Sequence, residues 1–193
     1  ITSVWQISQE LPEYRQLEKY EPKVTTRLYA GDGQLMAEYA AEKRLFVPEE
    51  KIPERVKQAF ISAEDKNFYS HFGVDLSGIT RAVLVNIKNM GSGRRPTGAS
   101  TITQQVAKNF LLSSELSYKR KIKEALLAIR IEQSFSKKHI LELYLNEIYL
   151  GNRAYGVAAA AINYFNKSLD ELTLEEIADL AALPKGPNNY NPK

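Results

Sequence analysis

From Pro53 onward, apolar residues recur at the spacing of an α-helix, and a capping residue precedes most of the apolar runs. Ser, Thr and Asp favour helix starts because their side-chain oxygen accepts a hydrogen bond from a free backbone N–H, and Pro suits the first helical position. The expected helix starts lie at Pro53 and Asp75, near Ser100 and Ser117, after Ser136, and at Thr173, where Thr173 and Glu176 form a capping box. We therefore expect a mainly α fold.

The N-terminal quarter follows a different pattern. Residues 24–30 and 35–39 alternate in polarity on either side of a glycine-rich turn, which predicts a short β-hairpin. We expect this hairpin to be the only regular sheet. Residues 1–22 are interpreted as a lead-in segment and residues 23–193 as one functional domain.

The composition is that of an ordinary globular domain: 193 residues, 44% hydrophobic and 25% charged. These values exclude a disordered, collagen-like or disulfide-stapled chain. The absence of cysteine excludes thiol nucleophiles and cysteine-bound zinc. No apolar run approaches the roughly 18 to 20 residues of a membrane-spanning helix. The chain opens on Ile1 without an initiator methionine, and we expect it to be a piece of a longer protein.

Positive charge is concentrated in one stretch. Residues 81–123 hold nine Lys or Arg and one acid, a net +8, so that the rest of the chain carries −5 of the total +3. Such a concentration indicates an anionic partner, for example a phosphate-bearing substrate or a phospholipid surface. A solvated charged face is the alternative.

A first candidate for chemistry is the string EDKNFYSHFG, which begins at Glu64. Glu64 would lie at the end of a helix, where a positioned carboxylate can take a proton from a hydroxyl. The alternative is structural, with Asp65 as a turn former, Phe68 in the core and His71 as a satisfied histidine. A metal site built from Glu64, Asp65 and His71 has no supporting ligand spacing.

The string GASTITQQVAKN at residues 98–109 is a second candidate. On a helix, Thr101, Gln105 and Lys108 form a polar stripe near the N-terminus, which suits oxygen-rich anionic ligands. A polar solvent face is the alternative, but successive threonines and paired glutamines are poor choices for helicity alone. We therefore favour a ligand.

The string RKIKE at residues 120–124 places Glu124 one turn after Arg120 and Lys121, on one side of a helix. Cations near a helix N-terminus do not stabilise the helix, but they suit the binding of a diphosphate. Simple ion pairing with Glu124 is the alternative interpretation.

Two further strings are weaker. Residues 142–151, ELYLNEIYLG, predict an amphipathic helix that stops at Gly151, and core packing accounts for most of it. Ser134 and Lys137 match an SxxK motif of acylating enzymes, but the partner motifs of that chemistry are absent from the sequence, so we interpret the match as coincidence.

Together, the motifs EDxxFxxHxG, GASTITQQxxKN, RKxxE and ELYLNEIYLG, in this order, resemble the peptidoglycan glycosyltransferases of glycosyltransferase family 51. The resemblance runs from about Tyr29 to Pro192. The hairpin and the ending LPKGPNNYNP are most similar to a bifunctional class A penicillin-binding protein, cut between its membrane helix and its transpeptidase domain.

The resemblance implies a lysozyme-like helical lobe with a smaller membrane-facing lobe. It implies a polymerase that joins lipid II to the growing glycan chain in β-1,4 linkage with inversion, and releases undecaprenyl diphosphate. Glu64 matches the catalytic base, and Glu124 the second essential acid. The substrate-binding residues implied are Asp65, Phe68, His71, Ser100, Thr101, Gln104, Gln105, Lys108, Asn109, Arg120, Lys121 and Asn146.

The resemblance also bears on cofactors and location. A divalent cation, magnesium or manganese, would be bound mainly through the substrate diphosphate, with no protein metal site. The apolar helix at residues 76–90 and the following loop with Arg94 and Arg95 would face the membrane, at the outer face of the bacterial cytoplasmic membrane. No nucleic-acid partner is expected.

Two other functions remain open at this point. A lysozyme-like hydrolase would use Glu64 as general acid, but it has no leaving diphosphate to explain Lys108, Arg120 and Lys121. A non-catalytic module that binds anionic lipid would need the basic stretch alone.

Overall fold

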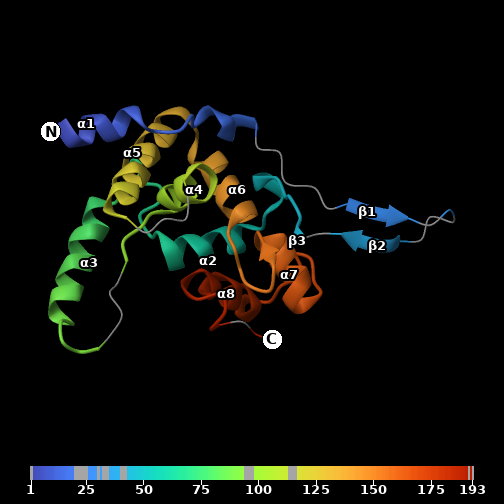
Figure 1. The fold of residues 1–193 in the computed structure, drawn as a ribbon. Coiled ribbons are helices and arrows are strands. Elements are labelled where there is room, and N and C mark those ends of the chain that lie inside the picture. Colours follow the sequence, from blue (N-terminus) through green and yellow to red (C-terminus); the bar gives the residue numbers. More distant parts are fainter. Residues whose placement is uncertain are drawn as a thin grey trace. The chain divides into compact units, whose positions relative to one another are not determined.

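The computed structural model describes residues 2–19, 26–29, 31, 35–39, 43–93, 98–112, 117–190 and 192. Most of these residues are helical, as predicted (Figure 1). The α-helices are α1 (Thr2–Gln9), α2 (Glu54–Glu64), α3 (Leu76–Lys88), α4 (Ile102–Leu111), α5 (Tyr118–Ser134), α6 (Lys137–Glu147), α7 (Val157–Phe165) and α8 (Leu174–Ala182). Short 3-10 helices lie at Arg15–Lys19, Glu49–Lys51 and Leu183–Lys185.

The strands form two small sheets. Strands β1 (Thr26–Tyr29) and β2 (Leu35–Tyr39) pair antiparallel, with a register shift between Leu28 and Tyr29. Strands β3 (Lys43–Arg44) and β4 (Ala154–Tyr155) pair in parallel, so the prediction of a single regular sheet is wrong. Two-residue strands that meet from distant parts of the chain have no local pattern to reveal them.

The capping residues set most helix starts as predicted. Asp75, Ser117 and Thr173 cap α3, α5 and α8, each through a side-chain oxygen that accepts a backbone N–H. Helix α4 starts slightly later than expected, because Thr101 rather than Ser100 is its N-cap. Thr101 and Gln104 there form a capping box, which the sequence analysis did not identify.

The region after α6 differs from the prediction. Helix α6 ends at Glu147, four residues before the expected stop at Gly151. Gly151 still has a positive φ of 87°, and a Cβ there would lie 2.6 Å from the Tyr164 hydroxyl oxygen. Helix α7 follows Gly156, which has a φ of 82° and provides no side-chain cap. Without a cap, the start of α7 has no strong local signal.

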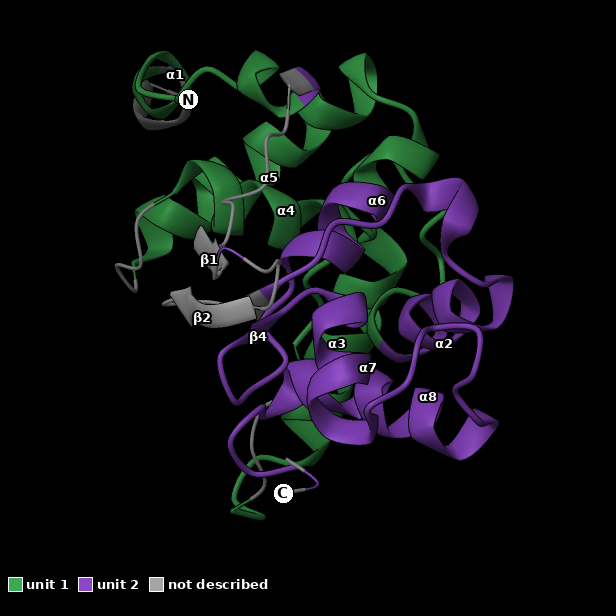
Figure 2. Cartoon of the chain, turned by 90° about the vertical axis from the view of Figure 1, so that its right-hand side faces the viewer, with its two compact units in different colours: residues 1–17, 64–140 green, residues 18–63, 141–193 purple. Residues whose placement is uncertain are grey.

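The chain divides into two compact units, coloured separately in Figure 2. Unit 1 comprises residues 1–17 and 64–140, and unit 2 comprises residues 18–63 and 141–193. Each unit joins distant parts of the sequence around its own apolar core. The fully buried core includes Phe68, Ile102, Leu127 and Ile131 in unit 1 and Val56, Phe60, Leu143 and Ile177 in unit 2. The boundary expected at residue 22 stays a prediction.

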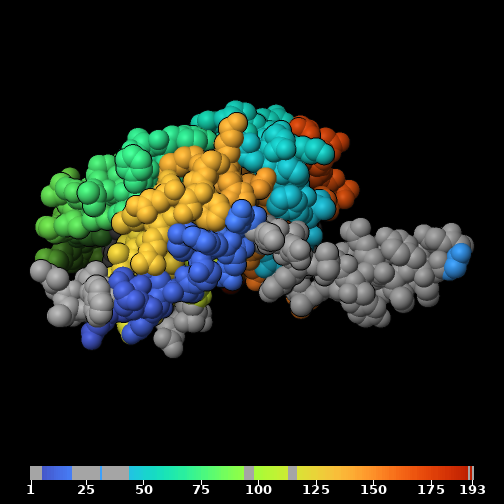
Figure 3. All heavy atoms as spheres, turned by 90° about the horizontal axis from the view of Figure 1, so that it is seen from above, coloured from blue at the N-terminus to red at the C-terminus, as the bar shows by residue number. Residues whose placement is uncertain are grey.

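Within unit 1, the N-terminal segment packs along α5, as Figure 3 shows for the blue and yellow atoms. Glu10 bridges two lysines of α5, with its Oε2 2.8 Å from Lys119 Nζ and 3.0 Å from Lys123 Nζ. Exposed pairs of this kind contribute little stability, and they show which face of α5 the segment covers. Across the part of the chain that the structure describes, no helix has the length and apolar character to cross a membrane.

Candidate active site

Glu64, the predicted base, is the last residue of α2 and is half-buried. Gln105, on α4, donates a hydrogen bond from Nε2 to Glu64 Oε2 at 2.8 Å. An amide donor on one carboxylate oxygen fixes the orientation of the group and leaves the other oxygen available. Both residues belong to unit 1, so this contact is internal to one compact body.

Asp65 and His71 form a hydrogen-bonded pair beside Glu64. Asp65 is 5% exposed, and its Oδ2 lies 2.9 Å from His71 Nε2 and accepts the backbone N–H of Ile102 at 3.0 Å. His71 Nδ1 accepts the N–H of Gly73 at 3.1 Å, which assigns the ring proton to Nε2. Phe68 is fully buried and packs edge-on against the His71 ring. A role of Asp65 and His71 in organising Glu64 stays a prediction.

Thr101 and Gln104 are buried, at 2% and 4% exposure, and their side chains bind backbone. The Thr101 hydroxyl donates to the Gly73 carbonyl at 2.6 Å and accepts the Gln104 N–H, while Gln104 Oε1 accepts the Thr101 N–H. Thr101 therefore lies at the N-cap and does not continue the expected polar stripe of Gln105 and Lys108. A substrate contact for either capping residue stays a prediction.

Glu124 is the centre of the basic cluster and is 2% exposed. Its two oxygens form ion pairs with Arg120 Nη1 at 2.5 Å and Lys121 Nζ at 2.7 Å. Lys121 also donates to the Ser100 hydroxyl at 2.7 Å. Arg120 Nε is buried and has no hydrogen-bond partner among the described residues. The carboxylate therefore holds two cations in place and leaves part of their donor capacity unused.

Lys108 completes the cluster from α4. Burial lowers the pKa of its ammonium, Glu124 partly opposes this, and Arg120 and Lys121 lower the pKa further. Glu64 also acts on Lys108, so this lysine lies within electrostatic reach of both predicted carboxylates. The ammonium has no hydrogen bond or ion pair with any residue of the described ranges, which leaves it available to an anion.

Two predicted residues lie apart from these contacts. Asn109 is exposed near the end of α4. Asn146 belongs to unit 2 and is 5% exposed, and its amide is occupied by backbone. Its Oδ1 accepts the Val47 N–H at 2.8 Å, and its Nδ2 donates to the carbonyls of Val47 and Glu142, each at 2.9 Å. The geometry supports a structural role for Asn146, and its substrate role stays a prediction.

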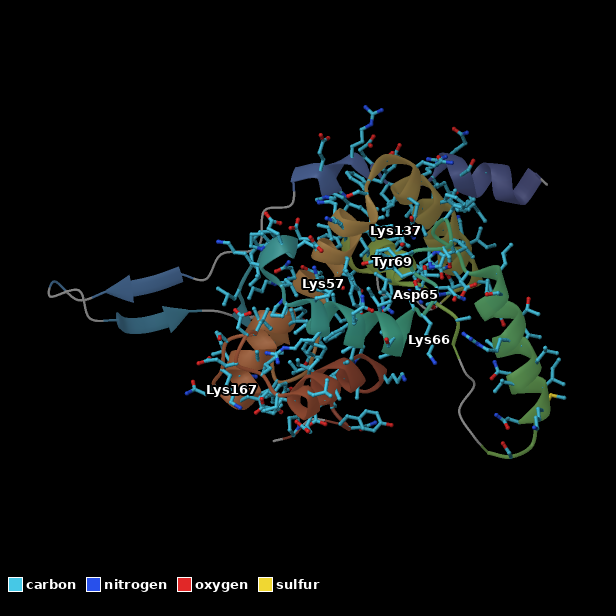
Figure 4. The ribbon with its side chains drawn as sticks, turned by 180° about the vertical axis from the view of Figure 1, so that it is seen from behind. Lys57, Asp65, Lys66, Tyr69, Lys137 and Lys167 are labelled. Atoms are coloured by element: carbon cyan, nitrogen blue, oxygen red, sulfur yellow. The ribbon has the colours of Figure 1, made fainter. Side chains whose placement is uncertain are left out.

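Sequence reasoning did not single out Thr103, Glu132 and Lys137, which contact one another and the segment that carries His71. Lys137, labelled with Asp65 in Figure 4, forms an ion pair with Glu132 and donates to the carbonyl of His71. The available signal was the SxxK string, but Ser134 donates to the Tyr14 hydroxyl and not to Lys137. A lysine that binds a distant carbonyl leaves no pattern of its own in the sequence.

Within the described ranges, no group of three His, Asp or Glu is placed to hold a metal ion. Glu124 already shares both oxygens with cations, and Glu64 accepts from Gln105. A divalent cation bound through the substrate diphosphate stays a prediction.

Comparison with known proteins assigns the chain to a family. A family model described as Transglycosylase matches residues 32–193. The chain belongs to this family and is a glycosyltransferase domain. It is 57% identical over 190 residues to penicillin-binding protein 1A of Rickettsia bellii, across 98% of this chain and 24% of that protein.

Other relatives carry the same name. Identity is 54% over 183 residues to penicillin-binding protein 1A of Neisseria flavescens, across 95% of this chain and 23% of the relative. The crystal structure of penicillin-binding protein 1A from Haemophilus influenzae aligns with 28% identity and a TM-score of 0.41, across 87% of this chain and 15% of that chain. The chain thus spans about a quarter of the length of its curated relatives.

Proposed function

We propose that this chain polymerises lipid II into β-1,4-linked glycan strands and releases undecaprenyl diphosphate, with Glu64 as general base of an inverting displacement. One observation carries the proposal. In a single compact unit, Gln105 orients the Glu64 carboxylate, and Lys108, within electrostatic reach of Glu64, joins the cations around Glu124. A base beside a cluster of cations fits a reaction in which a hydroxyl attacks and a diphosphate leaves.

The base step follows from the weakness of a sugar hydroxyl as a nucleophile. Glu64 takes the proton from the C4 hydroxyl of the incoming lipid II as that oxygen attacks the anomeric carbon of the growing chain. The bond from this carbon to the diphosphate oxygen breaks, and an α-linked diphosphate becomes a β-glycosidic bond. The hydrogen bond from Gln105 keeps the carboxylate aligned.

The departing diphosphate gains negative charge, and fixed cations stabilise such charge in the transition state. Arg120 and Lys121 are held by Glu124, and Lys108 has an available ammonium. A divalent cation bound through the diphosphate oxygens would supply further charge neutralisation. Glu124 serves this role by keeping the two paired cations in position, and Asp65 and His71 serve the base.

The membrane-facing lobe is part of the proposal. Helix α3 exposes apolar side chains along most of its length, while Gly78 and Ala82 are buried. The exposed ones include Leu76, Val83, Leu84 and Ile87, and Met90, just beyond the helix, is exposed as well. An apolar face of this kind suits insertion into the interface of a bilayer. The expected lipid contacts of Arg94 and Arg95 lie outside the described residues.

The proposed setting is the outer face of the bacterial cytoplasmic membrane, with a lysozyme-like helical lobe carrying the base. The full-length protein would add a membrane anchor and a transpeptidase domain.

The test is polymerisation of labelled lipid II in detergent with a divalent ion, with products separated by size. The parent chain should form glycan ladders, and Glu64→Gln should form none. Glu54→Gln is the matched control, because Glu54 begins the same helix and its side chain is exposed. Equal ladders from the parent and Glu64→Gln would remove the base assignment. Shortening of preformed glycan without polymerisation would indicate a hydrolase.

A further inference from the structure

A partly buried ion pair in unit 1 lies outside the predicted site. Lys137 Nζ, at the start of α6, is 2.6 Å from Glu132 Oε1, near the end of α5. The Glu132 side chain is 4% exposed and that of Lys137 is 21% exposed. Moving charges out of water is costly, so such a pair is weak evidence for stability and needs another explanation.

Each residue of the pair also contacts a segment that carries candidate site residues. Glu132 Oε1 also accepts the hydroxyl of Thr103 at 2.6 Å, and Thr103 is fully buried on α4. Lys137 Nζ donates to the carbonyl of His71 at 2.9 Å and lies 4.5 Å from the centre of the Phe68 ring. The ammonium thus binds a carboxylate, a carbonyl and an aromatic face, and each fixes it in a different direction.

The two segments lead to Glu64 by separate routes. On one side, the backbone of His71 carries the ring that binds Asp65, whose carboxylate caps α4 at Ile102. On the other side, Thr103 anchors α4 two residues before Gln105, which binds Glu64. A shift of the His71 turn or of α4 would therefore move the donor that orients the base.

We propose that Lys137, Glu132 and Thr103 are positioning residues for the Glu64 base, acting through the His71 turn and through α4. The inference rests on the proposed function, because it concerns the same base. It assigns Lys137 a role unrelated to the SxxK match, since its ammonium is engaged with Glu132 and the His71 carbonyl.

The test compares Lys137→Met with Lys57→Met in the full chain. Lys57 is the matched control, because it forms a 2.7 Å ion pair with Glu49 in unit 2 and the side chains of this pair are also largely buried. Figure 4 labels both Lys57 and Lys137. Polymerisation of lipid II is measured at a temperature at which both variants are folded by circular dichroism. We expect Lys137→Met to lower kcat about 100-fold with KM changed less than about twofold, because misplacement affects chemistry more than substrate binding.

Lys137→Arg should restore part of kcat, because a guanidinium can reach both oxygens. If Lys137→Met does not fold, Glu132→Gln takes its place in the test, because it keeps the side-chain volume and an acceptor for Thr103. Glu132→Gln should lower kcat by a smaller factor than the one expected for Lys137→Met. A loss confined to KM, or a kcat no lower than that of Lys57→Met, would overturn the inference.

A second readout does not depend on activity. In ¹⁵N spectra, the Nε2 proton of His71 should be protected from exchange in the parent and in Lys57→Met, and should lose protection in Lys137→Met. An unchanged His71 signal in Lys137→Met would also overturn the inference. If the parent chain shows the protected signal but makes no polymer, the proposed function fails and the positioning contact stands.

Discussion

Helices α4 and α8 begin with the same device in different surroundings. Thr101 with Gln104 and Thr173 with Glu176 each form a capping box, in which the side chains and backbone N–H groups of the two residues bind reciprocally. In α8 the box lies at the surface, with Thr173 exposed. In α4 both residues are buried, so water is not available as an alternative partner.

The buried box has acquired further partners. Thr101 also donates to the Gly73 carbonyl, and the next residue, Ile102, donates its N–H to Asp65. A carboxylate is favourable at a helix N-terminus because the free N–H groups there carry partial positive charge. The local motif that only starts α8 therefore joins α4 to the turn and the aspartate beside the predicted base. A helix cap can thus become part of a site when it is buried.

The largest loss of stability is expected from a substitution at Gly73, whose carbonyl accepts the hydrogen bond from Thr101. Gly73 has a φ of +90°, and a Cβ there would lie 2.5 Å from the Ala128 carbonyl oxygen. Gly73→Ala should lower the free energy of unfolding by about 4 kcal/mol, from strain and overpacking together. Gly91→Ala is the matched control, because Gly91 has a φ of +87° and open space around it.

For Gly91→Ala the strain alone should cost about 1 to 2 kcal/mol. Urea unfolding curves measure both values. Equal losses from the two substitutions would mean that the turn at Gly73 can move away from α5, and would weaken the view that it is a fixed part of the site.

The capping boxes themselves give the second prediction. Thr101→Val should cost about 2 to 3 kcal/mol, because the Gly73 carbonyl and the Gln104 N–H lose their partner in a buried setting. Thr173→Val should cost about 1 kcal/mol, because water can replace the lost cap at the surface. Thermal and urea unfolding of the two variants test the difference, and equal costs would contradict it.

The same comparison shows what the sequence could predict. The box at Thr173 was identified because capping follows from local spacing, and the caps at Asp75 and Ser117 were identified for the same reason. At Thr101 the sequence pattern predicts a ligand-facing hydroxyl. The hydroxyl instead donates to the carbonyl of Gly73, which lies 28 residues away in the sequence. No rule based on neighbouring residues predicts a contact between positions so far apart.

The contacts of the site residues divide in the same way, into contacts within one helix and contacts between distant parts of the chain. The ion pairs of Glu124 with Arg120 and Lys121 lie within one helical turn, and their spacing had indicated such pairing as the alternative to a bound diphosphate. The contact of Gln105 with Glu64 and that of Lys137 with His71 depend on how helices pack, so the sequence predicted neither contact, and the resemblance implied only that Gln105 binds substrate.

A third helix start, that of α3, gives a smaller effect that depends on pH. A hydrogen bond from Ser77, together with the Gly78 N–H and Asn67, lowers the pKa of Asp75 from 3.8 to about 2. The stability from this carboxylate is therefore present above its unfolded pKa and is lost as pH falls toward 2. Because the side chain is partly in water, the contribution should be about 1 kcal/mol rather than the full value of the shift.

Asp75→Asn should be less stable than the parent near neutral pH, and the difference should shrink as the pH falls from about 4 to about 2. Urea unfolding at several pH values measures the difference. A stability difference between the parent and Asp75→Asn that does not depend on pH would mean that the charge of the carboxylate adds nothing to the cap. The cap of α3 would then resemble the exposed cap of α8 more than the buried cap of α4.

The smallest effect on stability is expected at Lys108, near the other end of α4. Because burial lowers the pKa of its ammonium, the charge opposes folding, and Lys108→Met should leave the melting temperature unchanged or slightly raised. The same substitution should raise KM for lipid II about 10- to 100-fold, the loss expected when a charged donor to phosphate is removed. Stabilising contacts at the start of α4 and a partly desolvated cation near its end then have opposite effects on the fold.

The direction of the pKa shift sharpens this prediction. As pH rises, Lys108 should lose its proton below the ordinary lysine pKa of 10.5, so kcat/KM should begin to fall before that pH. Lys108→Arg keeps its charge throughout and should move the fall to higher pH. An alkaline limb that is identical in the parent and in Lys108→Arg would assign the fall to another titrating group.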